Sequence, residues 1–322
     1  MIVLWRITDR CNFGCGFCAY DRSLPFARSD VLADEVARFG SLLGRWAKHR
    51  GETILLSWLG GEPFLWKPLL ELSAKFSQDT GIRLSATTNG STLHRPDIRS
   101  TILDHFAELT ISVDGFADRH DDVRKAPGSW DRIAAGVQAL AGARTALKCP
   151  LRLRVNIVLM RGSIDDFQAL CLTLADWGVD EITFNQLGGR DRPEFYPANR
   201  LLPDEVVRLR DLLPELAAML AKRQVRLCAH NDYLDRISAT TLGQPLPFAD
   251  CGPAETFLFI DENCIIAPCS FTIGDYGIPT HSITTAADLA QLPAKMQQAR
   301  RLQRSKECDD CPSTQTFQKF AA

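Results

Sequence analysis

Short apolar runs alternate with amphipathic segments through the first two thirds of the chain. Six runs are rich in β-branched and aromatic residues, namely residues 2–8, 53–59, 82–88, 109–114, 151–159 and 181–186. Most are nearly continuous in apolar character, which is typical of strands covered on both faces. Segments with helical periodicity follow them, at residues 31–48, 68–78, 98–106, 130–140, 164–177 and 203–222. This alternation predicts an α/β fold with a parallel sheet and right-handed crossovers.

Six such units are too few for a closed eight-stranded barrel. We therefore expect a partial (β/α)6 barrel of the TIM type over residues 1–240, with its active site on the loops after the strands. The pattern changes after about Thr240: residues 257–260 and 264–267 predict a β-hairpin, and residues 286–303 predict one more helix. The interpretation is a second, small hairpin-and-helix domain over residues 241–322.

Composition narrows the class of protein. The 322 residues carry a formal net charge of -2, which gives no indication of a nucleic-acid partner. The N-terminus lacks a signal-peptide pattern, and no apolar stretch approaches the roughly 20 residues of a membrane-spanning helix. A cytoplasmic protein without a membrane partner is the expectation. The number of cysteines, 11, is odd, and the chain has no export signal, so a disulfide framework is disfavoured.

Three cysteines follow the first predicted strand as a CxxxCxxC loop: Cys11, Cys15 and Cys18. Three thiolates can hold three irons of a [4Fe–4S] cluster and leave the fourth iron open to another ligand. Zinc is the alternative, and the spacing alone does not exclude it. A zinc site would need a fourth ligand nearby, and no Cys or His lies between Cys18 and His49.

This loop resembles the signature of the radical S-adenosylmethionine (SAM) superfamily. The resemblance implies that SAM binds the open iron and is cleaved reductively to a 5′-deoxyadenosyl radical. It also implies an external electron donor of the flavodoxin or ferredoxin type.

Further segments resemble the SAM-binding motifs of that superfamily, in order along the chain. The residues that match are Phe17, Gly60, Gly61, Glu62, Pro63, Thr88, Asn89, Ser112, Asp114, Arg124, Asn156 and Val158. The Gly-Gly-Glu-Pro segment suits a close backbone approach and an ammonium partner, although a Gly-Gly turn before a helix is a purely structural alternative.

The resemblance assigns roles to the other matching residues. It implies that Thr88 and Asn89 lie near the SAM carboxylate and ribose, and that Ser112 and Asp114 meet the ribose hydroxyls. Arg124 is expected near the SAM carboxylate. The strand that carries Asn156 and Val158 is expected beside the adenine.

A second group of cysteines surrounds the predicted hairpin: Cys251, Cys269, Cys308 and Cys311. Four thiolates complete the ligand set of a second [4Fe–4S] cluster or of a structural zinc site. The arrangement resembles the twitch appendage, a shortened SPASM domain. Cys264 within the hairpin is an alternative to Cys251 or Cys269 as a ligand, or else a buried hairpin thiol.

A fully ligated second cluster can accept an electron from a substrate radical, which favours an oxidative reaction that consumes SAM. Tyr20 matches a tyrosine of sulfatase maturases and is the candidate catalytic residue, whereas Ser270 replaces the aspartate base of those enzymes. We expect oxidation of a ribosomally made peptide, with a separate protein that binds its leader. The alternatives are oxidation or decarboxylation of a sugar or nucleoside intermediate in natural-product biosynthesis, and a non-enzymatic, zinc-stabilised binding protein.

Overall fold

One curved sheet organises the molecule. The computed structural model describes residues 1–79, 82–246, 250–311, 313–314 and 316–317, and within them ten strands are ordered β10-β9-β8-β1-β2-β3-β4-β5-β6-β7. Their bounds are β1 (Ile2–Thr8), β2 (Leu55–Gly60), β3 (Arg83–Thr88), β4 (Phe106–Ser112), β5 (Arg152–Leu159), β6 (Glu181–Gln186), β7 (Arg226–Cys228), β8 (Phe257–Ile260), β9 (Ile265–Ala267) and β10 (Ile278–Pro279). Neighbouring strands from β1 to β7 pair in parallel, and β8 pairs in parallel with β1. Strand β9 pairs antiparallel with both β8 and β10.

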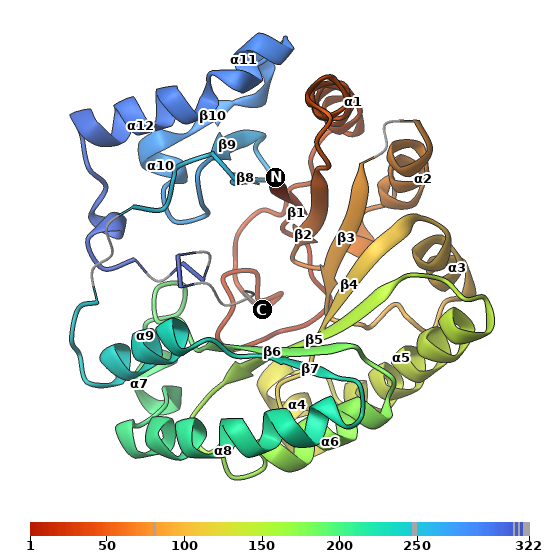
Figure 1. The fold of residues 1–322 in the computed structure, drawn as a ribbon, viewed down its shortest axis with the longest axis vertical. Helices are drawn as coiled ribbons and strands as arrows, with labels where there is room; N and C mark the ends of the chain where they lie inside the picture. The colour runs from red at the N-terminus through yellow and green to blue at the C-terminus, as the bar shows by residue number, and fades with distance from the viewer. Residues whose placement is uncertain (80–81, 247–249, 312, 315, 318–322) are drawn as a thin grey trace.

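Helices surround the outer side of this sheet, which curls without closing (Figure 1). The bounds are α1 (Ala33–Arg50), α2 (Leu69–Asp79), α3 (Pro96–His105), α4 (Ala117–Arg124), α5 (Ser129–Ala146), α6 (Phe167–Asp176), α7 (Tyr196–Asn199), α8 (Pro203–Ala221), α9 (Asn231–Thr241), α10 (Ile273–Tyr276), α11 (Ala286–Ala290) and α12 (Leu292–Leu302). The predicted open, mostly parallel α/β fold is confirmed.

Strand β5 shows how the two faces of the sheet differ. Leu153, Val155 and Ile157 are buried in the core, whereas Arg154 and Asn156 between them are only partly buried. Successive side chains of a strand point to opposite faces, so the apolar set packs under the helices and the polar set lines the inner side of the barrel. Strand β5 therefore alternates apolar and polar positions and is not one of the nearly continuous apolar runs.

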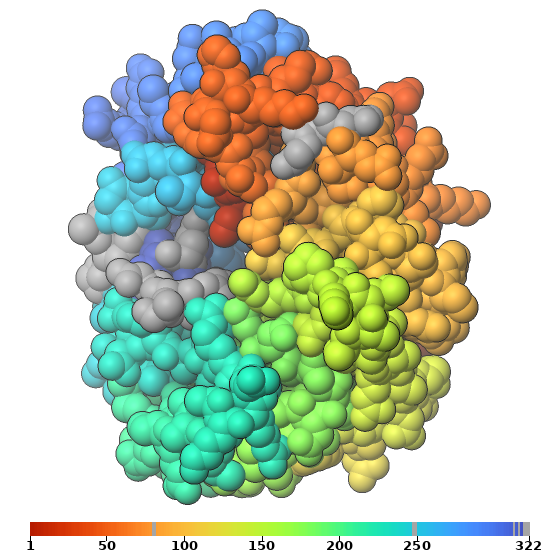
Figure 2. Space-filling view, turned by 45° about the vertical axis from the view of Figure 1, so that its right-hand side comes forward, coloured from red at the N-terminus to blue at the C-terminus, as the bar shows by residue number. Residues whose placement is uncertain are grey.

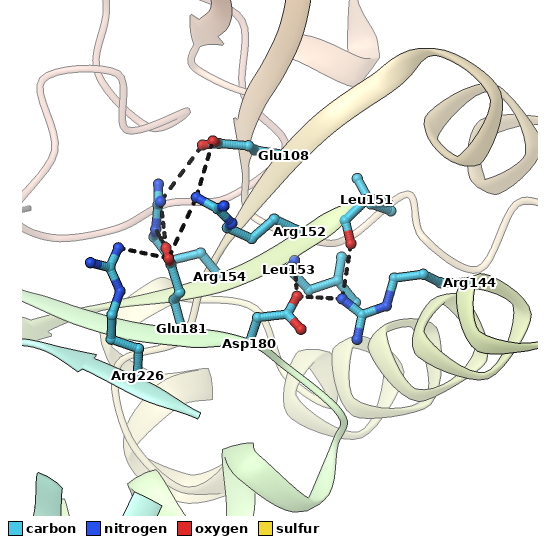
Figure 3. Close-up of polar contacts among 9 residues, drawn as sticks. All are labelled: Glu108, Arg144, Leu151, Arg152, Leu153, Arg154, Asp180, Glu181 and Arg226. Carbon is cyan, nitrogen blue, oxygen red and sulfur yellow. Dashed lines mark hydrogen bonds and ion pairs between the residues drawn. The ribbon is translucent and has the colours of Figure 1, made fainter. Parts of the chain in front are cut away.

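Charged side chains occupy the amino-terminal ends of β4 to β7 (Figure 3). Glu181 accepts hydrogen bonds from Arg154 at 2.7 Å and from Arg226 at 2.7 Å, and Glu108 lies 3.6 Å from Arg152. Burial alone would raise the pKa of Glu181, but the two guanidinium groups lower it below its ordinary value. These ion pairs tie four neighbouring strands together at the end of the barrel opposite the cysteine loop.

The carboxyl-terminal segment continues the sheet at β1. The predicted hairpin is confirmed as β8 and β9, and β8 pairs in parallel with β1 (Figure 1). On the outside, Arg38 of α1 donates to the carbonyl of Ile283 at 3.0 Å, and the surfaces of α1 and the carboxyl-terminal helices adjoin at the top of the molecule (Figure 2). The expected domain boundary near residue 240 stays a prediction, and 247–249, 312, 315 and 318–322 of the predicted second domain lie outside the described residues.

Two local expectations were wrong. The short strand β7 adds a seventh parallel strand to the barrel, where the pattern predicted six. The single helix expected over residues 286–303 is two helices, α11 and α12. The chain turns at Gln291 before Pro293, which suits the first turn of a helix because it lacks the N–H that a helix interior uses.

Candidate active site at the carboxyl ends of the strands

The cysteine loop lies at the carboxyl end of β1, against the last turn of α4. Gly14 donates to the carbonyl of Arg124 at 3.1 Å, and Gly16 donates to the carbonyl of Val123 at 3.3 Å. The three cysteines form a small cluster with Phe13 and Ala126, apart from the main core. Burial raises the pKa of Cys11 to about 11 and that of Cys15 to about 12. Metal binding must therefore displace their protons.

The end of β2 runs directly against this loop. The amide of Gly61 donates to the Thr8 carbonyl at 2.9 Å, and the amide of Glu62 donates to the Arg10 carbonyl at 2.8 Å. A Cβ atom at Gly60 would lie 2.7 Å from the Thr8 carbonyl oxygen, and one at Gly61 would overlap the Arg10 carbonyl. The glycines are therefore required by contact between two protein segments, in addition to any approach to a ligand.

Glu62 is a fully buried carboxylate with neutral donors. It accepts hydrogen bonds from the Thr88 hydroxyl at 2.8 Å, the Asn89 amide at 2.7 Å and the Phe64 amide at 3.2 Å. Burial raises its pKa to about 7, although these three hydrogen bonds and Arg124 act in the opposite direction. Pro63 begins a short 3-10 helix, Pro63–Leu65, immediately after it.

Asn89 connects the end of β3 to the cysteine loop. Its side-chain amide donates to Asn12 Oδ1 at 2.9 Å and contacts Cys11 Sγ at 3.7 Å. Gly90 follows with a φ of 76°, which a glycine adopts without strain. Two segments about 80 residues apart in the sequence therefore meet at the first cysteine.

Asp114 and Arg124 are paired with each other. The guanidinium Nη2 lies 2.7 Å from Asp114 Oδ2, and the two side chains are 7% and 0% exposed. The amide of Val158 donates to Asp114 Oδ1 at 2.8 Å, and the amide of Asp114 donates to His120 Nδ1 at 3.2 Å. Burial and Arg124 lower the pKa of His120 to about 4. Asp114 thus links the ends of β4, α4 and β5, an arrangement that the expected ribose role alone did not predict.

Ser112 and Asn156 are direct partners in the register of β4 and β5. Asn185 on β6 donates to Asn156 Oδ1 at 3.2 Å, and Val158 pairs with Asn185 in register. Phe17 from the cysteine loop lies under the Arg124 guanidinium, 5.8 Å from its ring centre. The expected SAM-binding residues thus gather at neighbouring strand ends around the cysteine loop.

Tyr20 lies between the cysteine loop and the hairpin. Its amide donates to Cys18 Sγ at 3.3 Å, and the Arg6 guanidinium lies 5.0 Å from its ring centre. Arg6 forms an ion pair with Glu262 in the hairpin turn, and burial raises the pKa of Tyr20. Arg6 and Glu262 were not predicted as functional residues from the sequence. The one feature that could have indicated them is that Arg6 interrupts an apolar strand. Its partner of opposite charge lies in a turn more than 250 positions away, so the pairing has no local pattern.

The second group of cysteines lines one cavity. Its walls include Cys251, Cys269, Cys308 and Cys311, together with Arg300. Within the described ranges no three Cys, His, Asp or Glu side chains converge closely enough to hold a single metal ion. The four thiols therefore surround a space and do not meet at a point.

Cys264 is placed away from that cavity wall. It lies at the hairpin turn with a φ of 60°, and its carbonyl accepts a hydrogen bond from the Thr280 amide at 2.8 Å. Burial raises the pKa of its thiol to about 11. This location matches the alternative of a hairpin thiol.

Comparisons with known proteins extend these observations. A sequence model described as the radical SAM superfamily matches residues 5–174, which is more than half of the chain. The AdoMet-dependent heme synthase of Methanosarcina barkeri is 28% identical over 140 residues, which are 43% of this chain and 38% of that protein. The GTP 3′,8-cyclase of Lactiplantibacillus plantarum is 33% identical over 167 residues, 50% of this chain and 46% of that protein. The chain thus spans less than half the length of these two relatives.

Solved structures share the fold at low sequence identity. Streptococcus suis SuiB bound to S-adenosylmethionine superposes with a TM-score of 0.64 at 15% identity, over 89% of this chain and 64% of that one. The structure of native anSMEcpe with bound AdoMet gives a TM-score of 0.66 at 16% identity, over 98% of this chain and 88% of that one. These likenesses concern the fold alone.

In the part of the chain that the structure describes, no helix combines the length and apolar character needed to cross a membrane. The matched sequence region begins within β1 and ends within α6, so it contains the cysteine loop and the ends of β1 to β5. On this evidence the chain belongs to the radical SAM superfamily.

Proposed function

We propose that this protein is a SAM-consuming oxidoreductase that uses a second iron–sulfur cluster to complete the oxidation of a peptide. The observation that carries the proposal is the cavity lined by Cys251, Cys269, Cys308 and Cys311, which come from three separate segments. Four thiolates complete the ligand set of a [4Fe–4S] cluster and leave no iron for SAM. Such a cluster suits electron transfer, in contrast to the open iron expected at Cys11, Cys15 and Cys18.

The bound SAM and its cluster would supply a 5′-deoxyadenosyl radical that removes a hydrogen atom from the substrate. Glu62 would accept the SAM ammonium. Its burial supports this role, because a buried carboxylate with only neutral hydrogen-bond donors is stabilised by a cation. Asn89 would hold Cys11 and the ligand-facing end of β3 in one position through its side-chain amide.

The adenosine part of SAM would lie along the ends of β4 to β6. Ser112 and Asn156 present polar side chains next to each other there, and Val158 offers an apolar surface for the adenine. Arg124 and Asp114 would act as a pair that holds the β4 end and Phe17 in place. Because they are paired, Arg124 and Asp114 would support SAM binding by positioning their neighbours as well as by direct contact.

Tyr20 is the proposed catalytic residue on the substrate side. It lies beside Cys18 and the Arg6–Glu262 ion pair, between the cysteine loop and the hairpin turn. Replacing Tyr20 with Phe should leave SAM cleavage intact and lower the yield of oxidised product at least tenfold. Deoxyadenosine and product are measured in the same anaerobic reaction. Equal losses of both would assign Tyr20 to cluster or SAM binding instead.

A peptide substrate is supported by the fold comparison. The similar structures include Streptococcus suis SuiB bound to precursor peptide SuiA, with a TM-score of 0.63, and native anSMEcpe with AdoMet and the Cp18Cys peptide, with a TM-score of 0.64. A separate leader-binding protein and a flavodoxin or ferredoxin donor would complete the system.

A small-molecule substrate is the second candidate, supported by curated relatives. Besides the GTP 3′,8-cyclases, the S-adenosylmethionine-dependent nucleotide dehydratase of Psychrobacter lutiphocae is 31% identical over 121 residues, 35% of this chain and 40% of that protein. These relatives act on nucleotides by name, which supports a nucleoside or sugar intermediate as the alternative substrate.

Anaerobic reconstitution tests the two-cluster proposal. Wild type should hold about eight irons and the triple variant Cys11→Ala, Cys15→Ala, Cys18→Ala about four. Only wild type should release 5′-deoxyadenosine with dithionite. About four irons in wild type, with zinc in the second site, would refute the auxiliary cluster. Zinc without iron and without deoxyadenosine would refute the reaction altogether.

A further inference from the structure

Each thiol of the second group contacts a defined hydrogen-bonding partner. Three of the partners are neutral: the Thr272 hydroxyl lies 3.4 Å from Cys269 Sγ, the Ser313 amide donates to Cys311 Sγ at 3.4 Å, and the Tyr276 hydroxyl shares a hydrogen bond with Cys308. Hydrogen bonds to the ligand sulfurs and the net charge around a cluster are principal determinants of its reduction potential.

The partner of Cys251 is a cation. Arg300 projects from α12, is 15% exposed, and its Nη1 lies 3.7 Å from Cys251 Sγ. Its Nη2 donates to Asp250 Oδ1 at 2.8 Å, which fixes the direction of the guanidinium. Among the described residues that line the cavity, Arg300 is the single basic one.

We propose that Arg300 raises the reduction potential of the iron–sulfur cluster held by Cys251, Cys269, Cys308 and Cys311, and so makes that cluster an electron acceptor. The inference rests on the proposed function. Reduction adds one negative charge to the cluster, and a nearby guanidinium stabilises the reduced form more than the oxidised form. The substrate radical would lose one electron to this cluster and one proton to water, and an external one-electron carrier of the ferredoxin or flavodoxin type would then take the electron away.

Asp250 gives the inference a test of sign. Its carboxylate precedes Cys251 in the chain and opposes the charge of Arg300, with which it is in contact. Neutralising Arg300 should lower the potential, whereas neutralising Asp250 should raise it. A role confined to packing would not produce opposite shifts from two residues in contact.

The experiment uses the full chain with Cys11, Cys15 and Cys18 replaced by Ala, so that only the second site contributes to the spectra. After anaerobic reconstitution the midpoint potential is measured by redox titration with electron paramagnetic resonance. Arg300→Gln should change the reduction equilibrium at least tenfold, a shift of about 59 mV to lower potential for one electron. Asp250→Asn should shift it to higher potential. The matched control is Arg301→Gln, the exposed neighbour on α12, and it should change nothing.

The outcomes separate the two proposals. If the parent variant holds no second cluster, the proposed function fails. If it holds four irons and Arg300→Gln leaves the potential unchanged, the role of Arg300 is overturned while the auxiliary cluster stands. If Arg300→Gln loses iron, the midpoint potential of Asp250→Asn becomes the deciding measurement, because that variant keeps the Arg300 guanidinium. A rise in potential then supports the inference, and no rise overturns it.

Discussion

The buried carboxylate of Glu62 should make the free energy of unfolding depend on pH. Its pKa is raised from 4.5 to about 7, chiefly by burial. Between these two values the folded chain binds more protons at this group than the unfolded chain does. The free energy of unfolding is therefore least affected by Glu62 below about pH 4.5, where the carboxyl is protonated in both states. It decreases as the pH rises through about 7.

The magnitude follows from the shift. A displacement of this size corresponds to about 3 kcal/mol when the whole window is crossed, as an order of magnitude. Glu62→Gln removes the titration but keeps the shape of the side chain. The difference in unfolding free energy between the cluster-free variant and the cluster-free wild type should therefore change by up to about 3 kcal/mol between pH 5 and pH 8, in favour of the variant at high pH.

Urea denaturation followed by circular dichroism, at pH steps across this range, measures that difference. Other titrating groups are common to both chains and cancel. A saturating concentration of SAM should reduce the slope in the reconstituted wild type, because an ammonium group beside Glu62 favours the ionised form. A difference that is constant with pH would refute the reasoning, since it would mean that Glu62 is already ionised in the folded chain.

Three other predictions concern single residues. Gly61→Ala should reduce the iron content of the first site, because the new Cβ atom would overlap the Arg10 carbonyl. The control Gly142→Ala, at a helical position with open space, should keep full iron and raise the free energy of unfolding by up to about 1 kcal/mol. Arg124→Leu leaves Asp114 buried and unpaired, which should cost about 3–5 kcal/mol by chemical denaturation, and a loss below about 1 kcal/mol would contradict a tight pair. Cys264→Ser should retain all iron of the second site in an iron assay, since this thiol does not line the cavity; loss of four irons would make it a ligand.

Local signals accounted for much of the molecule. Apolar periodicity depends on neighbours a few residues apart, so it predicted β1 to β6 and six helices of the barrel, mostly with errors of a few residues at their ends. It did not predict α4, α7 or α9. The three-residue strand β7 was not predicted as a strand of the sheet, because so short a run carries no periodicity. The cysteine loop was recognised because its three ligands lie within eight consecutive residues, so their spacing alone carries the chemistry.

Contacts between distant segments were decided only by the tertiary structure. Sequence assigned Asp114 and Arg124 to a ligand, whereas folding pairs them with each other because α4 returns to the end of β4. It could not assign Arg300 any role, because its contact with Cys251 depends on how α12 lies across a cavity closed by segments nearly 50 residues apart. The sequence by itself determined which chemical groups are present and which elements carry them. Which of them meet depends on strand register and helix packing, properties that no single segment possesses.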